Sequence, residues 1–155
     1  MAKGIKVLAD NRKAYHNYHM LEKYEAGIEL FGTEVKSLRQ GNFSLGDSYA
    51  QVKQGEMWLV NMHISPYEEG NRFNKEPLRD RKLLMHKREI MRLYGQVKQE
   101  GLTLVPTKVY LKDSLVKVEI ALAKGKRDYD KRRSIMERDM DKAMRRAVKQ
   151  TQRYD

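Results

Sequence analysis

The chain has 155 residues, a formal net charge of +11 and no cysteine, and 40% of its residues are hydrophobic while 34% are charged. These values predict one domain with a small core and a heavily ionised surface, and they exclude disulfides and thiol chemistry. No apolar run is long enough to span a bilayer and no apolar signal core follows Met1, so we expect a cytoplasmic protein whose basic surface attracts a polyanion, either nucleic acid or an anionic membrane.

The first part of the chain predicts a loose segment followed by strand. Residues 1–10 are short and basic, and we expect no regular structure there. Residues 15–22 contain Tyr, His and Met, which favour a strand, and alternation places Tyr18 and Met20 on the same face. Strand character continues from Tyr24, with glycines placed like bends.

The hydrophobic period changes at Thr33, which predicts a short helix. Apolar side chains three residues apart share one face of this helix, while Lys36 and Arg39 form a neighbouring basic face. Thr33 is a plausible N-cap, and a glycine suits the helix end. We expect the helix to be pinned to a sheet with its cations in solvent, and we expect Glu25 to be buried in the same unit.

The middle of the chain predicts a β-hairpin, a long loop and a second helix. Two strands flank a turn signal at Gln54-Gly55. Residues 65–81 are polar and contain several glycine, asparagine and proline residues, which predicts a functional or mobile loop. Residues 86–100 carry apolar side chains at helical spacing, and Gly101 is placed to end that helix.

The last predicted strands complete a small β-rich domain. Residues 105–111 and 116–122 alternate between apolar and polar, with Pro106 at an edge or a bulge. The predicted fold is mainly β with short helices, of the α+β class: a small antiparallel OB-like barrel of about six strands, spanning residues 1–123. An SH3-like barrel or an open α+β sheet is also compatible with the pattern.

A composition shift at Lys124 marks a basic tail, residues 124–155. The tail has 12 basic and 6 acidic residues, and its apolar face is thin. An isolated helix of this kind is marginal in water, so we expect the tail to be disordered alone and helical when it meets a partner.

The sequence contains no recognised catalytic motif, and we predict no enzyme, no metal site and no cofactor. His16 and His19 lie three apart on a predicted strand and so point to opposite faces, which makes them a poor metal pair. Basic groups instead recur along the chain beside aromatic residues, as expected for a surface that binds unpaired nucleic acid. Tyr129 is the ring most strongly assigned to function, because its neighbours are charged and provide no core.

Asn11 and Glu25 carry groups that can read RNA. An amide both donates and accepts hydrogen bonds, and a carboxylate accepts them from a base or ribose donor although phosphates repel it. The alternative role of Glu25, equally compatible with the sequence, is a salt bridge to a cation on a neighbouring strand.

Several blocks of the sequence, taken together, resemble the SsrA-binding protein family, also called small protein B. In chain order, the blocks are Asn11–His16, Tyr24–Leu30, Gly32–Arg39, Asp47–Tyr49, Arg79–Leu84 and Ala123–Arg132. The resemblance covers nearly the whole chain. Two positions depart from the usual pattern: that of Asn17 is often acidic in the family, and that of Tyr129 is sometimes His.

This resemblance implies an OB-like barrel that binds the tRNA-like domain of transfer-messenger RNA and delivers it to stalled ribosomes for trans-translation. Elongation factor Tu and alanyl-tRNA synthetase are implied co-workers on the same RNA, and the protein itself would be non-catalytic. The RNA-binding residues implied by the matching motifs are Asn11, Arg12, Glu25, Lys36, Arg39, Arg79, Arg81 and Lys82.

For the tail, the resemblance implies contacts with the ribosome. The tail would enter the decoding centre and the empty mRNA channel, with Gly125 as a hinge, and would form its helix there. Tyr129, Asp130, Lys131 and Arg132 are implied to contact bases of ribosomal RNA. The full set of tail residues implied to bind the ribosome is Lys124, Gly125, Lys126, Arg127, Tyr129, Asp130, Lys131, Arg132 and Arg133.

Two other functions are compatible with the charge alone. A general single-strand RNA-binding or ribosome-associated structural protein would share the barrel and the charge but would prefer no particular RNA. A membrane-surface protein is disfavoured, because the tail has no Trp or Phe on its apolar face.

Overall fold

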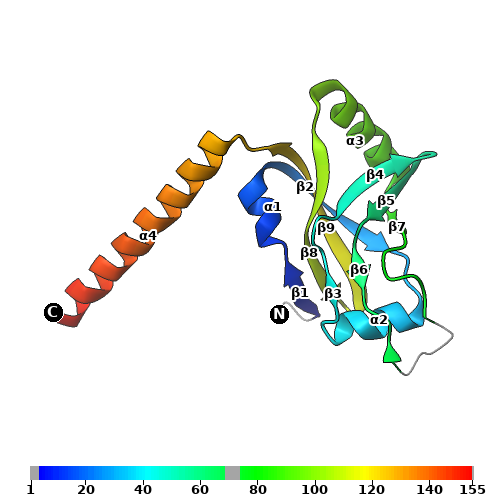
Figure 1. Cartoon of the computed structure of the whole chain (residues 1–155), viewed down its shortest axis with the longest axis horizontal. Coiled ribbons are helices and arrows are strands. Elements are labelled where there is room, and N and C mark those ends of the chain that lie inside the picture. Colours follow the sequence, from blue (N-terminus) through cyan, green and yellow to red (C-terminus); the bar gives the residue numbers. More distant parts are fainter. Residues whose placement is uncertain (1–3, 69–73, 155) are drawn as a thin grey trace. The chain divides into compact units, whose positions relative to one another are not determined.

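The computed structural model describes residues 4–68 and 74–154, apart from the side chains of residues 128–129 and 148–154. Contacts divide the chain into two compact units, Met1–Gly125 and Lys126–Asp155 (Figure 1). The second unit contains one helix, α4 (Asp128–Tyr154). That this segment is disordered without a partner stays a prediction.

Within the described residues, the first unit contains nine strands and three helices. In chain order these are β1 (Ile5–Asp10), α1 (Arg12–Asn17), β2 (Tyr18–Ile28), α2 (Gly32–Arg39), β3 (Phe43–Ser44), β4 (Tyr49–Lys53), β5 (Glu56–Val60), β6 (His63–Ile64), β7 (Arg81–Leu84), α3 (Lys87–Glu100), β8 (Thr103–Lys112) and β9 (Leu115–Gly125). The short strands β3 and β6 form a separate two-stranded sheet.

Six of the strands close into a ring. β8 pairs with β9, β9 with β2, β2 with β7, β7 with β5, β5 with β4, and β4 again with β8. All of these pairings are antiparallel, and β1 is an additional strand on β8. The predicted mainly β fold, with a small antiparallel OB-like barrel, is confirmed.

The interior of the ring is filled by apolar side chains from all six of its strands. Along β9, for example, alternation places Val118, Ile120 and Leu122 inside, where each is at most 2% exposed. Ile90 and Leu93 of α3 are buried in the same core. On the opposite face of β8 and β9, α1 packs in a smaller cluster of Ala14, Val105, Ala121 and Ala123.

Left-handed backbone conformations mark the tight turns of the barrel. The predicted β4–β5 hairpin turns at Gly55, with φ of 76°, and Gly101 ends α3 as predicted, with φ of 63°. The β8–β9 hairpin turns at Asp113 and Ser114, which have φ of 50° and 69° although neither is glycine. A register shift after Pro106 shows a bulge in β8, one of the two features predicted for this residue.

The N-terminal part of the chain differs from the prediction. Residues 5–10 form β1 instead of a loose segment, because their backbone pairs with the distant strand β8. Residues 12–17 form α1, so residues 15–17, the beginning of the predicted strand 15–22, are helical. The helix forms because Asn11 caps it and Ala14 packs against β8 and β9.

Two element boundaries also differ. The N-cap of α2 is Phe31, two residues before the predicted Thr33, and the backbone N–H of Phe31 donates to Glu34 Oε1 at 2.9 Å. Thr33 is therefore inside the helix. β9 continues to Gly125, so the predicted domain boundary after Ala123 falls two residues inside a strand.

Candidate nucleic-acid interface

α2 presents two of the predicted RNA-binding cations to solvent. Leu38 is fully buried beneath the helix, and Lys36 and Arg39 on its other faces are exposed. Lys36 Nζ lies 5.3 Å from the centroid of the Tyr67 ring, and Arg39 Nη2 donates to the carbonyl of Ser114 at 3.4 Å. Because these are weak surface contacts, both cations remain available to a phosphate.

A cluster of three charges holds α2 on the barrel. Glu34 Oε1 lies 2.5 Å from Arg79 Nη2, and Glu34 Oε2 lies 2.8 Å from Arg81 Nε. Burial would raise the pKa of Glu34, but hydrogen bonds from Arg79, the Phe31 amide and Arg81 outweigh it, so this pKa lies below its ordinary value. Glu34 is therefore an ionised, buried carboxylate at neutral pH.

Arg81 is buried in β7, which argues against its predicted contact with RNA. The residue has no exposed surface. Besides Glu34, its guanidinium donates to the carbonyl of Met62 at 2.6 Å and to that of Pro77 at 3.0 Å. These bonds tie α2, the segment after β5 and the start of β7 together, which is a structural role.

Arg79 is shared between the cluster and the surface. Its side chain is 24% exposed and is paired with Glu34. Its guanidinium carbon also lies 4.8 Å from the centroid of the exposed Phe31 ring. Much of its hydrogen-bonding capacity is therefore used within the protein.

Glu25 lies on the surface of β2, which corrects the expectation that it is buried: its side chain is 41% exposed. It accepts a hydrogen bond from the Tyr110 hydroxyl, and Lys112 Nζ lies 3.4 Å away. The Tyr110 hydroxyl and then Lys112 hold the pKa of Glu25 below its ordinary value, while burial raises the pKa of Tyr110. A salt bridge, the alternative that the sequence left open, is thus present, although its cation lies on β8 and not on a strand paired with β2. The carboxylate stays ionised and fixed.

The structure places Glu25 and Lys82 in one polar groove of about 520 Å³, here called the Glu25 groove, together with Gly27, Leu84 and Lys117. Gly27 of β2 is aligned with Lys117 of β9 and with Leu84 of β7, so the three positions share one face of the sheet. Gly27 contributes no side chain to the floor of the groove. A Cβ at this position would lie 3.2 Å from the Cβ of Leu84, which is a tight contact.

Lys82 and Lys117 give this groove its available positive charge. Lys82 Nζ lies 3.6 Å from Glu56 Oε2, a partly exposed ion pair that contributes little to stability. Lys117 was not singled out in the sequence, and neither was Leu84, which is 48% exposed. Alternation along β9 indicates that Lys117 points outward, but only the register with Gly27 brings both residues beside Glu25.

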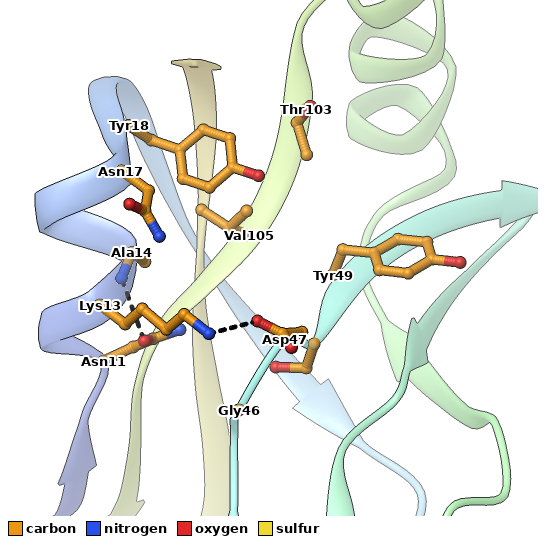
Figure 2. A pocket seen from close by; sticks show the side chains of 11 residues that line it. Asn11, Lys13, Ala14, Asn17, Tyr18, Gly46, Asp47, Tyr49, Thr103 and Val105 are labelled. Carbon is orange, nitrogen blue, oxygen red and sulfur yellow. Dashed lines mark hydrogen bonds and ion pairs between the residues drawn. The ribbon is translucent and has the colours of Figure 1, made fainter. Parts of the chain in front are cut away.

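Asn11 lines a different pocket, beside α1 (Figure 2). It is 8% exposed. Its Oδ1 accepts from the N–H of Ala14 at 3.2 Å, and its Nδ2 donates to the carbonyl of Pro106 at 2.8 Å. Both ends of the amide are therefore used by the fold, which argues against the predicted reading of RNA by Asn11. Arg12, the first residue of α1, is exposed.

The predicted tail residues lie on both sides of the boundary between the two units. Lys124 and Gly125 belong to β9, where they are paired with His19 and Tyr18 of β2. The remaining ones lie in the connection to α4 or in its first turns: Lys126, Arg127, Tyr129, Asp130, Lys131, Arg132 and Arg133.

Local hydrogen bonds order the beginning of α4. The backbone N–H of Arg127 donates to Asp130 Oδ2 at 3.3 Å, and Lys126 Nζ donates to Ser134 Oγ at 2.9 Å. Arg132 is exposed, and the side chain of Tyr129 lies outside the described part of the chain. Several cations at this end of the helix are thus presented to solvent.

In the part of the chain that the structure describes, no group of three or more His, Cys, Asp or Glu side chains could hold a metal ion. Among the same residues, no helix combines the length and the apolar character needed to cross a membrane.

The barrel and its polar groove place the chain in the class of small basic proteins built on an OB-like fold. Within that class, a family model described as SmpB protein matches residues 8–150, and the chain belongs to this family. The family resemblance predicted from the sequence blocks is therefore confirmed.

The chain is similar to curated relatives over nearly its whole length. The SsrA-binding protein of Carboxydothermus hydrogenoformans is 61% identical over 144 residues, which cover 93% of this chain and 97% of that protein. The SsrA-binding protein of Desulfitobacterium hafniense is 57% identical over 145 residues, covering 94% and 93%. A chain in a solved structure described as "tmRNA-SmpB: a journey to the center of the bacterial ribosome" is 49% identical, with a TM-score of 0.65 over 82% of this chain and 93% of that one.

Proposed function

We propose that this protein binds the tRNA-like domain of transfer-messenger RNA and delivers it to stalled ribosomes for trans-translation. Support comes from membership of the SmpB family, from the relatives named SsrA-binding protein and from the similar chain described with tmRNA and the bacterial ribosome. The net charge of +11 provides long-range attraction to RNA. In this proposal the protein is a non-catalytic binding partner in the cytoplasm.

The observation that carries the proposal is the exposed carboxylate of Glu25, fixed in a groove beside Lys82 and Lys117. An ionised carboxylate repels phosphates, so a surface that only neutralises the RNA backbone gains nothing from it. It can, however, accept hydrogen bonds from base or ribose donors, while the two lysines contact phosphates. The Glu25 groove thus contains both an acceptor that can recognise a base or a ribose and cations that can bind phosphates.

Other exposed cations extend this interface in the proposal. Arg12 on α1 and Lys36 and Arg39 on α2 are accessible and can bind phosphates without reading sequence. Arg79 contributes mainly by holding α2, through Glu34.

We assign the ribosomal contacts to the tail, residues 124–155. Its cations and Tyr129 suit the phosphates and unpaired bases of ribosomal RNA in the decoding centre and the empty mRNA channel. Gly125 is the last residue of β9 and adjoins the boundary between the units, which suits a hinge. Elongation factor Tu and alanyl-tRNA synthetase act on the same RNA in this scheme.

A gel-shift titration with the tRNA-like domain of transfer-messenger RNA tests the proposal. The full chain, Glu25→Ala and Glu56→Ala are compared at two salt concentrations, with ordinary tRNA as competitor. Both variants remove one anion from the same groove, but only Glu25 is fixed by Tyr110. Glu25→Ala should weaken binding roughly tenfold through the lost base or ribose contact, whereas Glu56→Ala should slightly strengthen it by freeing Lys82.

If both variants gain affinity and tRNA competes fully, the charge is generic, and the protein is a general RNA-binding or ribosome-associated structural protein. Persistent binding in excess tRNA and at the higher salt concentration supports recognition, because phosphate neutralisation alone is strongly weakened by salt.

A further inference from the structure

The helix α4 carries an exposed stripe of methionines that the proposed function does not use. Within the described residues, four methionines are more than half exposed, and three of them, Met136, Met140 and Met144, lie on α4. Their exposed fractions are 64%, 64% and 66%. Because they are four residues apart, their side chains follow one another along a single face of the helix. We call these three residues the methionine stripe.

Solvent has free access to the methionine stripe. The positions between its members carry exposed charged side chains, among them Glu137 and Asp141. Glu137 forms an ion pair with Arg133, at 3.3 Å, but both side chains are about two-thirds exposed. A small uncharged oxidant such as hydrogen peroxide can therefore reach the thioethers. In the barrel, by contrast, Met57 and Met62 have no exposed surface.

The thioether is the sulfur group that a peroxide can oxidise in this chain, because the sequence contains no cysteine. The sulfur takes one oxygen atom from hydrogen peroxide and becomes a sulfoxide, and the other oxygen atom leaves as water with both hydrogens. Sulfur thereby loses two electrons, which the peroxide gains. A sulfoxide reductase reverses the step with two thiols, which form a disulfide while the oxygen leaves as water.

We propose that the methionine stripe is a reversible oxidation site through which peroxide lowers the activity of the tail. Each sulfoxide replaces a flexible apolar group with a polar one, so three of them turn the apolar face of α4 into a polar face. A partner that covers this face must then desolvate three polar groups, which opposes binding. The inference rests on the proposed function in one respect, since it takes ribosome rescue as the activity that depends on the tail.

Peptide mapping by mass spectrometry tests the site itself. The full chain is treated with hydrogen peroxide under native conditions for increasing times, and sulfoxide is measured at each methionine. The three members of the stripe should oxidise about tenfold faster than the buried Met57 and Met62, because oxidation follows exposure. Met91 of α3, which is 51% exposed, should also oxidise quickly, and it provides a matched control outside the tail.

Ribosome rescue in a reconstituted translation assay tests the consequence. The protein is treated with peroxide, the peroxide is removed, and the rescue rate is divided by the rate of the same protein before treatment. This ratio should fall to about one fifth for the unmodified chain and for Met91→Leu, whereas the triple variant Met136→Leu, Met140→Leu, Met144→Leu has no sulfur on the stripe and should keep its own rate. A sulfoxide reductase with a thiol should restore the treated protein.

Glutamine at the same three positions imitates the polarity of the sulfoxide without any oxidation. Leu and Gln favour a helix about as well as Met does, so the leucine and glutamine triple variants differ in polarity rather than in helix formation. The glutamine variant should rescue ribosomes more slowly than the leucine variant in the absence of peroxide. Circular dichroism checks that both variants have the same helix content.

Any of three results would overturn the inference. The first is a methionine stripe that oxidises no faster than Met57. The second is an equal loss of rescue on peroxide treatment in Met91→Leu and in the leucine triple variant. The third is full rescue by a protein in which all three members of the stripe are sulfoxides.

Binding of the tRNA-like domain distinguishes failure of this inference from failure of the proposed function. Oxidation of methionine changes no charge, so treated and untreated protein should bind that RNA with affinities within about twofold of each other. Normal binding and rescue by the untreated chain, together with rescue that resists peroxide, would reject the oxidation switch alone. An untreated chain that neither binds this RNA nor rescues ribosomes would reject the proposed function.

Discussion

Arg81 and Lys82 are adjacent basic residues with opposite surroundings. In a β-strand, successive side chains point to opposite faces of the sheet, so one enters the barrel side and the other the solvent side. Arg81 is 0% exposed and surrounded by acceptors, whereas the Lys82 side chain is 32% exposed in the Glu25 groove. Arg81 therefore stabilises the fold, whereas Lys82 is the residue of the pair that the proposed function assigns to RNA binding.

Replacing each of these residues by Met should give different phenotypes. Arg81→Met leaves the buried Glu34 with the partly exposed Arg79 as its remaining ion-pair partner and leaves several carbonyls unpaired, so it should lower the free energy of unfolding by about 3–5 kcal/mol. Lys82→Met should change it by less than about 1 kcal/mol but should weaken RNA binding and lower the salt slope by about one unit. Urea denaturation and salt-dependent gel shifts measure both. Equal loss of stability in the two variants would contradict the assignment.

Glu34 should make the fold sensitive to acid. The pKa of Glu34 is lowered in the folded state from its ordinary value of 4.5. Its ionised form therefore contributes stability that is present above about pH 4.5 and is lost as the pH falls through the lower, folded pKa. Glu34→Gln should be clearly less stable than the unmodified chain at pH 7, and the gap should shrink below pH 4.5. Thermal unfolding across this range measures the gap, which would stay constant if Glu34 were not ionised in the cluster.

At the scale of elements, the sequence predicts those strands, helices and turns that local patterns determine. Alternation and helical spacing identify β8, β9 and α3, and turn residues identify the hairpin at Gly55, because each of these signals lies within the element itself. β1 and α1 were not predicted, because the contacts that stabilise them come from residues far away in the sequence. Ile5 and Val7 remain 54% and 46% exposed and become a strand only by pairing with β8. α1 depends on Asn11, whose amide binds Pro106.

In the candidate site, too, features set by local spacing could be predicted, and features set by distant contacts could not. The cations Lys36 and Arg39 were correctly placed on an exposed helix face, because helical spacing decides that. The burial of Arg81 could not be predicted, since it requires Glu34 to turn inward from α2 toward a strand far away in sequence. Leu84 and Lys117 were missed because their proximity depends on the pairing register of three strands.

The β8–β9 turn offers a stabilising substitution. Ser114 has φ of 69°, a conformation that favours glycine, and a two-residue hairpin turn of this kind prefers glycine in second place. Ser114→Gly should raise the free energy of unfolding by about 0.5–1 kcal/mol. Ser44→Gly, at a residue without positive φ, should lower it. Thermal melts of both variants measure the difference, and an equal loss in the two would contradict the strain at Ser114.

At the scale of the whole molecule, the chain is divided into a closed barrel and a helical tail. Contacts cluster within Met1–Gly125 and within Lys126–Asp155. The last two residues of the first unit, Lys124 and Gly125, pair with β2. The contacts therefore place the division after Gly125, two residues beyond the predicted boundary after Ala123.

Truncation after Gly125 should leave a folded barrel. Its melting temperature should stay within a few degrees of that of the full chain, and its affinity for the tRNA-like domain should fall by less than about tenfold, since only distributed phosphate attraction is removed. Ribosome rescue in a reconstituted translation assay should be abolished. Truncation after Ala123, which also removes two paired residues of β9, is the comparison and should be less stable. If the longer truncated form loses RNA recognition as well, the tail belongs to the RNA interface.

Ring closure also sets when the barrel can form during synthesis. β9 is the partner of both β2 and β8, yet β2 ends at Ile28 and β9 begins only at Leu115. A nascent chain therefore carries β2 without its main neighbour until almost the whole first unit has been translated. Until then the unpaired edges of β2 and β8 can pair with other chains, and closure must wait for long-range contacts that form slowly. A chain whose translation stops before Leu115 would be an open sheet, exposed to aggregation and to proteases.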